Sequence, residues 1–531
     1  MPKHKTIPII DLFAGPGGLG EGFAAFRDAK NSQRFQIMLS IEKDAFAHKT
    51  LLLRTFLREF KNNYFPDAYY KFLQNLTIPQ SQGLNHLLQQ FPREAASAQR
   101  KAMHAELGKS DQKGINQAIS ASLQNSAEFI LIGGPPCQAY SIAGRSRNKG
   151  NAAYEPDKDH RQYLYKEYLQ VIADHTPALF VMENVKGLLS ATINNELVFN
   201  RIIEDLGYPS RALVRDGRVS SRSRSRKGSA QYNIYSFVAS ASSNPQSLMD
   251  FVVRMEKHGV PQTRHRLVLL GVRKDLGNIT PIGLKETASV PVSQILEGLP
   301  RLRSGLSQEK NNNEHWIKLL GTIEHYRWLK SSKKKAGSKV CRQLLEVAEN
   351  IRPPTEGQGD EFIRCTPTIA YRPDWFLDKR IGGICNHSSR SHMRNDLFRY
   401  LYASCFAKVH GRTPMMRDFP TDLLPDHASV VNALDGGFFE DRFRVQISHS
   451  PATTITSHIA KDGHYYIHPD PFQCRSLTVR EAARLQTFPD NYYFIGGRTA
   501  QYIQVGNAVP PLLAVQIAEI VFSIMKKIGF A

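Results

Sequence analysis

The sequence predicts an α/β protein built on a doubly wound, mostly parallel sheet. Apolar runs typical of strands that are buried on both faces recur along the chain. The first run, residues 7–13, leads directly into a glycine-rich turn and a short helix. A later run at 129–132 is followed by Cys137. This cysteine therefore lies where open α/β sheets place their ligands, just beyond the carboxyl end of a strand.

The elements of the first domain follow in chain order. After the strand at 7–13 we expect a helix over about 21–26 and a strand over 36–41 that ends at Glu42. Residues from about 45 to 107 are polar and helical in pattern, and we interpret them as a helical insertion. The sheet pattern returns in later segments, which are strands at 129–132, 177–182 and 267–272 and a helix around 163–174.

Three regions divide the chain. The regular alternation fades after about Asn278, so we expect a catalytic and cofactor-binding domain over 1–279 and a second, irregular domain over 280–470. Residues 471–531 return to regular structure. There, Thr478 is the expected N-cap of a helix and Glu481 completes its capping box. Two prolines at 510–511 precede an apolar helix over 512–528.

The net charge indicates a polyanionic partner. The 531 residues include 69 basic and 48 acidic side chains, a formal charge of +21. Nucleic acid is the first candidate and an anionic membrane surface the second. No apolar run approaches the roughly 20 residues that cross a bilayer, and Asp11 comes too early for a secretory signal. We therefore expect a cytoplasmic protein without a membrane. Its six cysteines form no Cys-x-x-Cys pair, so we expect free thiols and no metal site.

The first turn has the features of a nucleotide-binding loop. Gly15, Gly17 and Gly18 allow a ligand to approach the backbone at a helix N-terminus. Glu42, at the end of the next strand, is placed to accept hydrogen bonds from ribose hydroxyls. These residues indicate an adenosine-containing cofactor and do not distinguish NAD from S-adenosylmethionine, although the glycine spacing disfavours NAD.

Three further segments carry reactive side chains. Two prolines hold Cys137 in an extended turn, as a nucleophile requires. Glu183 follows the strand at 177–182, next to the expected place of Cys137. Alternation places Gln262, Arg264 and Arg266 on one face, where two guanidiniums suit an anion or a carbonyl. Each segment also has a simpler interpretation. Cys137 can be a buried thiol, Glu183 a capping group, and the arginines at 264 and 266 a solvated basic edge.

Six segments, taken in this order, closely resemble the DNA cytosine-C5 methyltransferases of bacterial restriction-modification systems. They are Asp-Leu-Phe-Ala-Gly-x-Gly-Gly at 11–18, Gly-Pro-Pro-Cys-Gln at 134–138, Glu-Asn-Val at 183–185, Gln-x-Arg-x-Arg at 262–266, Arg-Glu-Ala-Ala-Arg-Leu-Gln-x-Phe-Pro at 480–489 and Gly-Asn-Ala-Val-Pro at 506–510.

The resemblance implies a sheet of the S-adenosylmethionine-dependent methyltransferase type and a target-recognition domain between Arg266 and Arg480. It implies that the Cys137 thiolate adds to carbon 6 of a flipped-out cytosine, that Glu183 protonates nitrogen 3, and that Arg264 and Arg266 assist. The implied cofactor-binding residues are Phe13, Gly15, Gly17, Gly18, Glu42, Pro135, Asn507 and Val509. The implied DNA-binding residues are Gln138, Ser141, Arg145 and Arg147.

The resemblance also implies a monomer that acts on double-stranded DNA near the nucleoid, and a cognate restriction endonuclease that acts on the same site without a required complex. A tRNA cytosine methyltransferase, a catalytically silent DNA-binding regulator and an NAD-dependent oxidoreductase are the alternatives. Glu106 and Asp111 both stay open as the acid that contacts the adenine ring. The Ser/Arg run at 218–227 is either a solvated loop or a DNA-backbone contact.

Overall fold

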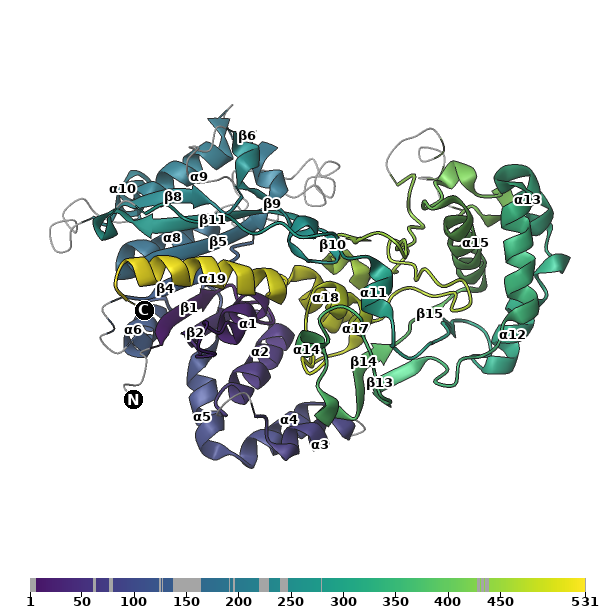
Figure 1. The fold of residues 1–531 in the computed structure, drawn as a ribbon, viewed down its shortest axis with the longest axis horizontal. Helices are drawn as coiled ribbons and strands as arrows, with labels where there is room; N and C mark the ends of the chain where they lie inside the picture. The colour runs from purple at the N-terminus through teal and green to yellow at the C-terminus, as the bar shows by residue number, and fades with distance from the viewer. Residues whose placement is uncertain are drawn as a thin grey trace.

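Two lobes lie along the long axis of the molecule (Figure 1), the larger containing the sheet and the smaller containing helices α12, α13 and α15. The computed structural model describes residues 6–60, 64–75, 80–123, 126, 128–136, 164–190, 192–193, 196–218, 229–238, 247–277, 279–426, 430, 434 and 439–530. Cys137, Gln138, Ser141, Arg145, Arg147 and most of the Ser/Arg run lie outside the described residues.

The larger lobe is built on one sheet. Within the described residues this sheet has eight strands in the order β3-β2-β1-β4-β5-β11-β8, and β9 also pairs with β11. The strands from β3 to β5 pair in parallel, whereas β11 runs antiparallel to its neighbours. The bounds are β1 Ile7–Leu12, β2 Phe35–Glu42, β3 Ala102–His104, β4 Ile130–Gly133, β5 Leu179–Val185, β8 Tyr232–Ser236, β9 Val252–Arg254 and β11 His265–Arg273. The predicted doubly wound, mostly parallel sheet is confirmed.

Helices cover both faces of this sheet. On one face lie α1 (Gly18–Ala25) and α19 (Pro511–Lys527). The other face carries α6 (Gln112–Leu123), α8 (Leu164–His175), α9 (Val198–Gly207) and α10 (Pro209–Arg215). Successive residues of β4 pack into different cores, Leu131 into one and Ile132 into the other. Burial on both faces explains why the strands are continuous apolar runs.

The stretch predicted as a helical insertion is helical for most of its length. It contains α2 (Ala45–Leu57), α3 (Asp67–Gln74), α4 (Gln80–Gln89) and α5 (Pro92–Lys101). It does not stay outside the sheet, because β3 follows α5 directly and pairs with β2. The predicted end of the helical segment at residue 107 is therefore wrong. A strand of three residues is too short to show a period in the sequence.

The middle region is more regular than predicted. Its largest core packs α12 (Asn313–Gly321), α13 (Arg327–Asn350) and α15 (Arg394–His410) around Trp316 and Leu344. Short elements connect this core to the larger lobe. They are β10 Gln262–Thr263, α11 Val292–Leu296, β12 Gly305–Leu306, β13 Gly359–Arg364, α14 Pro373–Phe376, β14 Gly383–Ser388, β15 Ser391–His392 and β16 Ala452–Thr453.

The helix α3 braces the middle region against the larger lobe. The guanidinium of Arg380 lies 4.2 Å from the ring centre of Tyr64 and 4.3 Å from that of Tyr70. Arg380 also donates to the carbonyl oxygen of Phe65, and the Tyr70 hydroxyl donates to Asp378 at 2.8 Å. These contacts make α3 a strut between the two parts of the chain.

The C-terminal segment packs against the larger lobe. In α17 (Val479–Leu485) Thr478 and Glu481 form the expected capping box. Helices α18 (Arg498–Asn507) and α19 follow, with Pro511 in the first turn of α19. Contrary to the expectation from the apolar runs, the stretch Arg498–Lys527 could cross a membrane by length and composition, but 67% of its apolar window is buried. Its contacts with α1 and the sheet identify it as a core helix.

Candidate active site

The carboxyl ends of β4 and β5 bring two of the predicted segments together. The side-chain amide of Asn184 donates to the carbonyl oxygen of Pro135 at 3.2 Å. A side chain at Gly134 would begin 3.2 Å from Oε2 of Glu183. The parallel register of β4 and β5, with Gly133 opposite Met182, produces this proximity. The segment that leads to Cys137 therefore leaves the sheet beside Glu183.

Arg266 completes an ion pair at this edge. Its Nε lies 3.2 Å from Oε1 of Glu183, and both side chains are 15% exposed. A further hydrogen bond runs from the Arg266 guanidinium to the carbonyl oxygen of His265. Burial lowers the pKa of Arg266, although the Glu183 carboxylate opposes this. The pair keeps an acid and a guanidinium together at the sheet edge with part of each open to a ligand.

Arg264 has a different environment from the one predicted. It is 2% exposed, and its guanidinium donates to the carbonyl oxygens of Ile455, Gly506 and Ala508, with Nη1 to Ile455 at 2.7 Å. Burial lowers its pKa to about 9. The alternation that placed it beside Arg266 stops here, because β10 pairs with β16 instead of joining the main sheet. Arg264 therefore links the sheet to the C-terminal segment.

The glycine loop after β1 has strained, open geometry. Phe13 has φ +55°, a region that bulky residues rarely adopt, and Gly15 and Gly17 also have positive φ. The position that a Cβ would take at Gly15 has no atom within 4 Å, whereas at Gly18 it would lie 2.3 Å from the Val509 carbonyl oxygen. The loop therefore has free space on the Gly15 side and a wall formed by the C-terminal segment on the other.

Glu42 closes the loop from the neighbouring strand. One carboxylate oxygen accepts the Gly15 N–H at 2.7 Å, and the other accepts the N–H groups of Lys43 and Asp44. Burial raises the pKa of Glu42, which the three backbone donors oppose. Among the other predicted cofactor residues, Asn507 is exposed at the end of α18 and Val509 is half-buried.

The two acids left open differ in their contacts. Glu106 follows β3, and its carboxylate lies 3.2 Å from the ammonium of Lys43, the residue after Glu42. Hydrogen bonds from Lys109 and Lys43 lower the pKa of Glu106. Asp111 precedes α6 and accepts the backbone N–H of Lys113. The contact with Lys43 places Glu106 on the same side of the sheet as Glu42.

Sequence reasoning missed two residues that shape the loop. Asp11 in β1 is 1% exposed, and neither of its carboxylate oxygens has a hydrogen-bond partner among the described residues. Burial raises its pKa to about 8. The sequence signal for Asp11 is an acidic residue inside an otherwise apolar strand. Tyr492, whose hydroxyl donates to the Pro16 carbonyl oxygen, gave no signal because its partner is distant in sequence.

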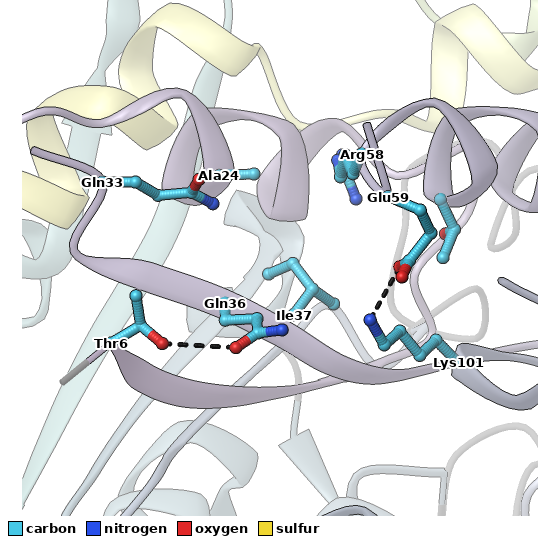
Figure 2. Close-up of a pocket in the computed structure, with 9 residues that line it drawn as sticks. Thr6, Ala24, Gln33, Gln36, Ile37, Arg58, Glu59 and Lys101 are labelled. Atoms are coloured by element: carbon cyan, nitrogen blue, oxygen red, sulfur yellow. Dashed lines mark hydrogen bonds and ion pairs between the residues drawn. The ribbon is translucent and has the colours of Figure 1, made fainter. Parts of the chain in front are cut away.

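A separate cavity lies at the opposite edge of the sheet (Figure 2). It has a volume of about 290 Å³ and is lined near the amino ends of β1 and β2 by Thr6, Gln36 and Ile37. The ion pair of Lys101 with Glu59, 2.7 Å apart, forms another wall. This cavity lies near the amino ends of β1 and β2, whereas the glycine loop follows the carboxyl end of β1. The described residues hold no cluster of His, Cys, Asp and Glu able to bind a metal ion.

Comparisons with known proteins agree with this arrangement. The model of the C-5 cytosine-specific DNA methylase family matches residues 93–214 and 251–523, well over half of the chain. The type II methyltransferase M.Bpa9945I of Bacillus paralicheniformis is 31% identical and aligns over 97% of this chain and 98% of its own. The DNA (cytosine-5-)-methyltransferase M.ApeKI of Aeropyrum pernix is 26% identical over 98% of both chains. The chain therefore belongs to the C-5 cytosine-specific DNA methylase family and is a DNA (cytosine-5-)-methyltransferase.

Proposed function

We propose that this enzyme transfers the methyl group of S-adenosylmethionine to carbon 5 of a flipped-out cytosine in a specific duplex DNA sequence, through a covalent Cys137 adduct. The observation that supports this most is the Glu183–Arg266 pair beside the segment leading to Cys137. Methyltransferases named as type II among the relatives favour a modification enzyme of a restriction system. We also propose that it works as a cytoplasmic monomer near the nucleoid and shares its site with an endonuclease, without a required complex.

The glycine loop fits an adenosine-containing cofactor. The space beside Gly15 admits a ligand next to the backbone, and the Glu42 carboxylate, already at that backbone, is an acceptor for ribose hydroxyls. Phe13, Gly17, Gly18, Pro135, Asn507 and Val509 are the other residues that we propose to line the site, with Glu106 toward the adenine. S-adenosylmethionine, when bound, supplies an electrophilic methyl group.

The chain's own residues account for the remaining steps. The Cys137 thiolate adds to carbon 6, which makes carbon 5 nucleophilic, and the negative charge that develops on the ring is neutralised at nitrogen 3 by a proton from Glu183. Carbon 5 then takes up the methyl group. Loss of the carbon 5 proton to a base expels the thiolate, and return of the nitrogen 3 proton to Glu183 restores the neutral aromatic ring. The contacts of Arg264 favour Arg266 alone as the guanidinium beside the pyrimidine.

The cytosine must leave the duplex before Cys137 reaches it. Gln138, Ser141, Arg145 and Arg147 follow the nucleophile, and we propose that they contact the DNA around the vacated position. These four residues lie outside the described part of the chain.

Two experiments test the proposal. Bisulfite sequencing of DNA from cells that express the protein should show methylated cytosines in one sequence context. A duplex with 5-fluorocytosine at that position should then form a covalent complex with the wild-type enzyme and none with Cys137→Ser. An adduct mapped to another residue, or methylation of tRNA instead of plasmid DNA, would contradict the proposal.

A further inference from the structure

The helix α13 carries a basic face that the proposed reaction does not use. Its exposed cations are Arg327, Lys330, Lys333, Lys334, Lys335, Lys339 and Arg342. The first acidic residue of the helix is Glu346, one turn beyond this set. Within the described part of the chain, none of these cations makes an ion pair, and Lys335 donates to the carbonyl oxygen of Arg417. The face is therefore a row of charges that the fold leaves unneutralised.

The opposite side of α13 explains why the charges face outward. Trp328, Val340 and Leu344 are buried in the core of the smaller lobe. A helix with one apolar stripe must present its other residues to solvent. In Figure 1, α13 lies at one end of the long axis, with α15 between it and the larger lobe. The basic face is therefore remote from the edge of the sheet where Glu183 and Arg266 lie.

The position of the cations argues against a purely local role. Gly337, with φ 86° and ψ 169°, interrupts the helix. Lys333 to Lys335 lie at the carboxyl end of the first segment, where the helix dipole favours cations. Lys339 and Arg342 begin the second segment, where the dipole disfavours them. The helix dipole thus favours the cations at 333–335 and disfavours Lys339 and Arg342.

We propose that the basic face of α13 is a second DNA-binding surface that holds the phosphate backbone of a DNA segment other than the one in the active site. The cations lie on both helical segments of α13, over residues 327–342; an uninterrupted helix of that length would measure about 20 Å, over which duplex DNA carries on the order of ten phosphates. The inference depends on the proposed function only in that DNA is the polyanion on which the enzyme works. Binding there would keep the enzyme on long DNA between targets.

The first test uses free enzyme and a random 300-bp duplex. The variant K330Q/K333Q/K334Q/K339Q should bind at least tenfold more weakly at 100 mM salt and should lower the slope of log K against log salt by about two to four. The matched control, K30Q/K113Q/K526Q/K527Q, removes the same charge from exposed lysines of the larger lobe and should change the slope by less than one. Equal slopes for the two variants would overturn the proposal.

The second test blocks the active site. Enzyme trapped on a short 5-fluorocytosine duplex should still bind a labelled random 40-bp duplex, and the α13 variant should lose this binding while the control keeps it. Failure of the trapped wild-type complex to bind the second duplex would overturn the proposal. If no trapped complex forms, the proposed reaction fails and the salt slopes of the free enzyme alone decide about α13. Turnover on saturating plasmid should be the same in both variants and the wild type.

Discussion

Glu183 and Arg266 meet across the antiparallel pair of β5 and β11, with Oε1 and Nε 3.2 Å apart. Glu183 pairs with Val268, so Arg266 lies two residues away on the same face and reaches the carboxylate diagonally. The pair thus depends on strand register, which the main-chain hydrogen bonds of the sheet fix. A rigid sheet holds these two groups in place more firmly than a loop would.

Glu183→Gln should reduce methyl transfer by about 10²- to 10⁴-fold, because the amide keeps the shape and cannot deliver a proton. Cofactor affinity should stay within about threefold. Single-turnover transfer of a labelled methyl group and calorimetry with the cofactor measure the two effects. A loss confined to cofactor affinity would instead place Glu183 in the wall of the cofactor pocket.

Arg264→Met should act on stability. The substitution keeps much of the apolar stem and leaves the carbonyl oxygens of Ile455, Gly506 and Ala508 without their donor. We expect a loss of about 2–4 kcal/mol in the free energy of unfolding, measured in urea. Arg266→Met, whose partner Glu183 is 15% exposed, should cost less stability and more turnover. The reverse ranking would show that Arg264 is the residue beside the pyrimidine.

The glycine loop offers a matched pair of substitutions. In Gly18→Ala the new methyl group would lie 2.3 Å from the Val509 carbonyl oxygen, so the loop must move away from the C-terminal segment. Gly15→Ala meets no atom within 4 Å and bears only the strain of φ +58°, about 1–2 kcal/mol. Without cofactor, Gly18→Ala should therefore lower the melting temperature more. If Gly15→Ala instead weakens cofactor binding without a matching loss of stability, the free space beside Gly15 is where the cofactor lies.

The buried carboxyl of Asp11 should make stability fall as pH rises. Its pKa is raised to about 8 in the folded protein, so folding favours the protonated form. From about pH 4, where the unfolded chain ionises, to about pH 8 the contribution declines, by up to about 5 kcal/mol in total. Asp11→Asn should make the free energy of unfolding depend less on pH, as measured by urea unfolding at pH 5 and pH 8. If the free energy of unfolding of the variant falls with pH as steeply as that of the wild type, groups other than Asp11 cause the pH dependence.

The contacts between Arg380 and the segment around α3 should affect DNA binding more than the rate of methyl transfer. Arg380→Ala removes the contacts with Tyr64, Tyr70 and the Phe65 carbonyl oxygen, which loosens the middle region from the larger lobe. We expect the KM for plasmid DNA to rise about three- to tenfold with kcat nearly unchanged. Arg380→Lys, which keeps the charge and loses the planar stacking, should give an intermediate value. A fall in kcat at constant KM would contradict this role.

The sequence predicted those parts of the fold in which local pattern and tertiary contact agree. The buried strands, the capping box of Thr478 and Glu481, and the proline start of α19 all depend on neighbours in sequence. The pattern failed at β3, which is too short to show a period, and at Arg264, where a change of pairing partner breaks the alternation. Asp11 is buried without a hydrogen-bond partner among the described residues, and Tyr492 bonds to Pro16 from a distant part of the chain, so no spacing rule describes either. Cys137 stays a prediction from its motif.

The wall behind the glycine loop is supplied by residues that lie far away in sequence, in α19 and the segment before it. Gly18 lies against Val509, and Gly22 leaves room for Ala514 in α19. A chain that ends at Tyr492 therefore lacks the residues that back the glycine loop and cover α1. A chain that lacks α18 and α19 should therefore lose the wall behind the loop, and a separately expressed fragment with these helices is the natural candidate for restoring it.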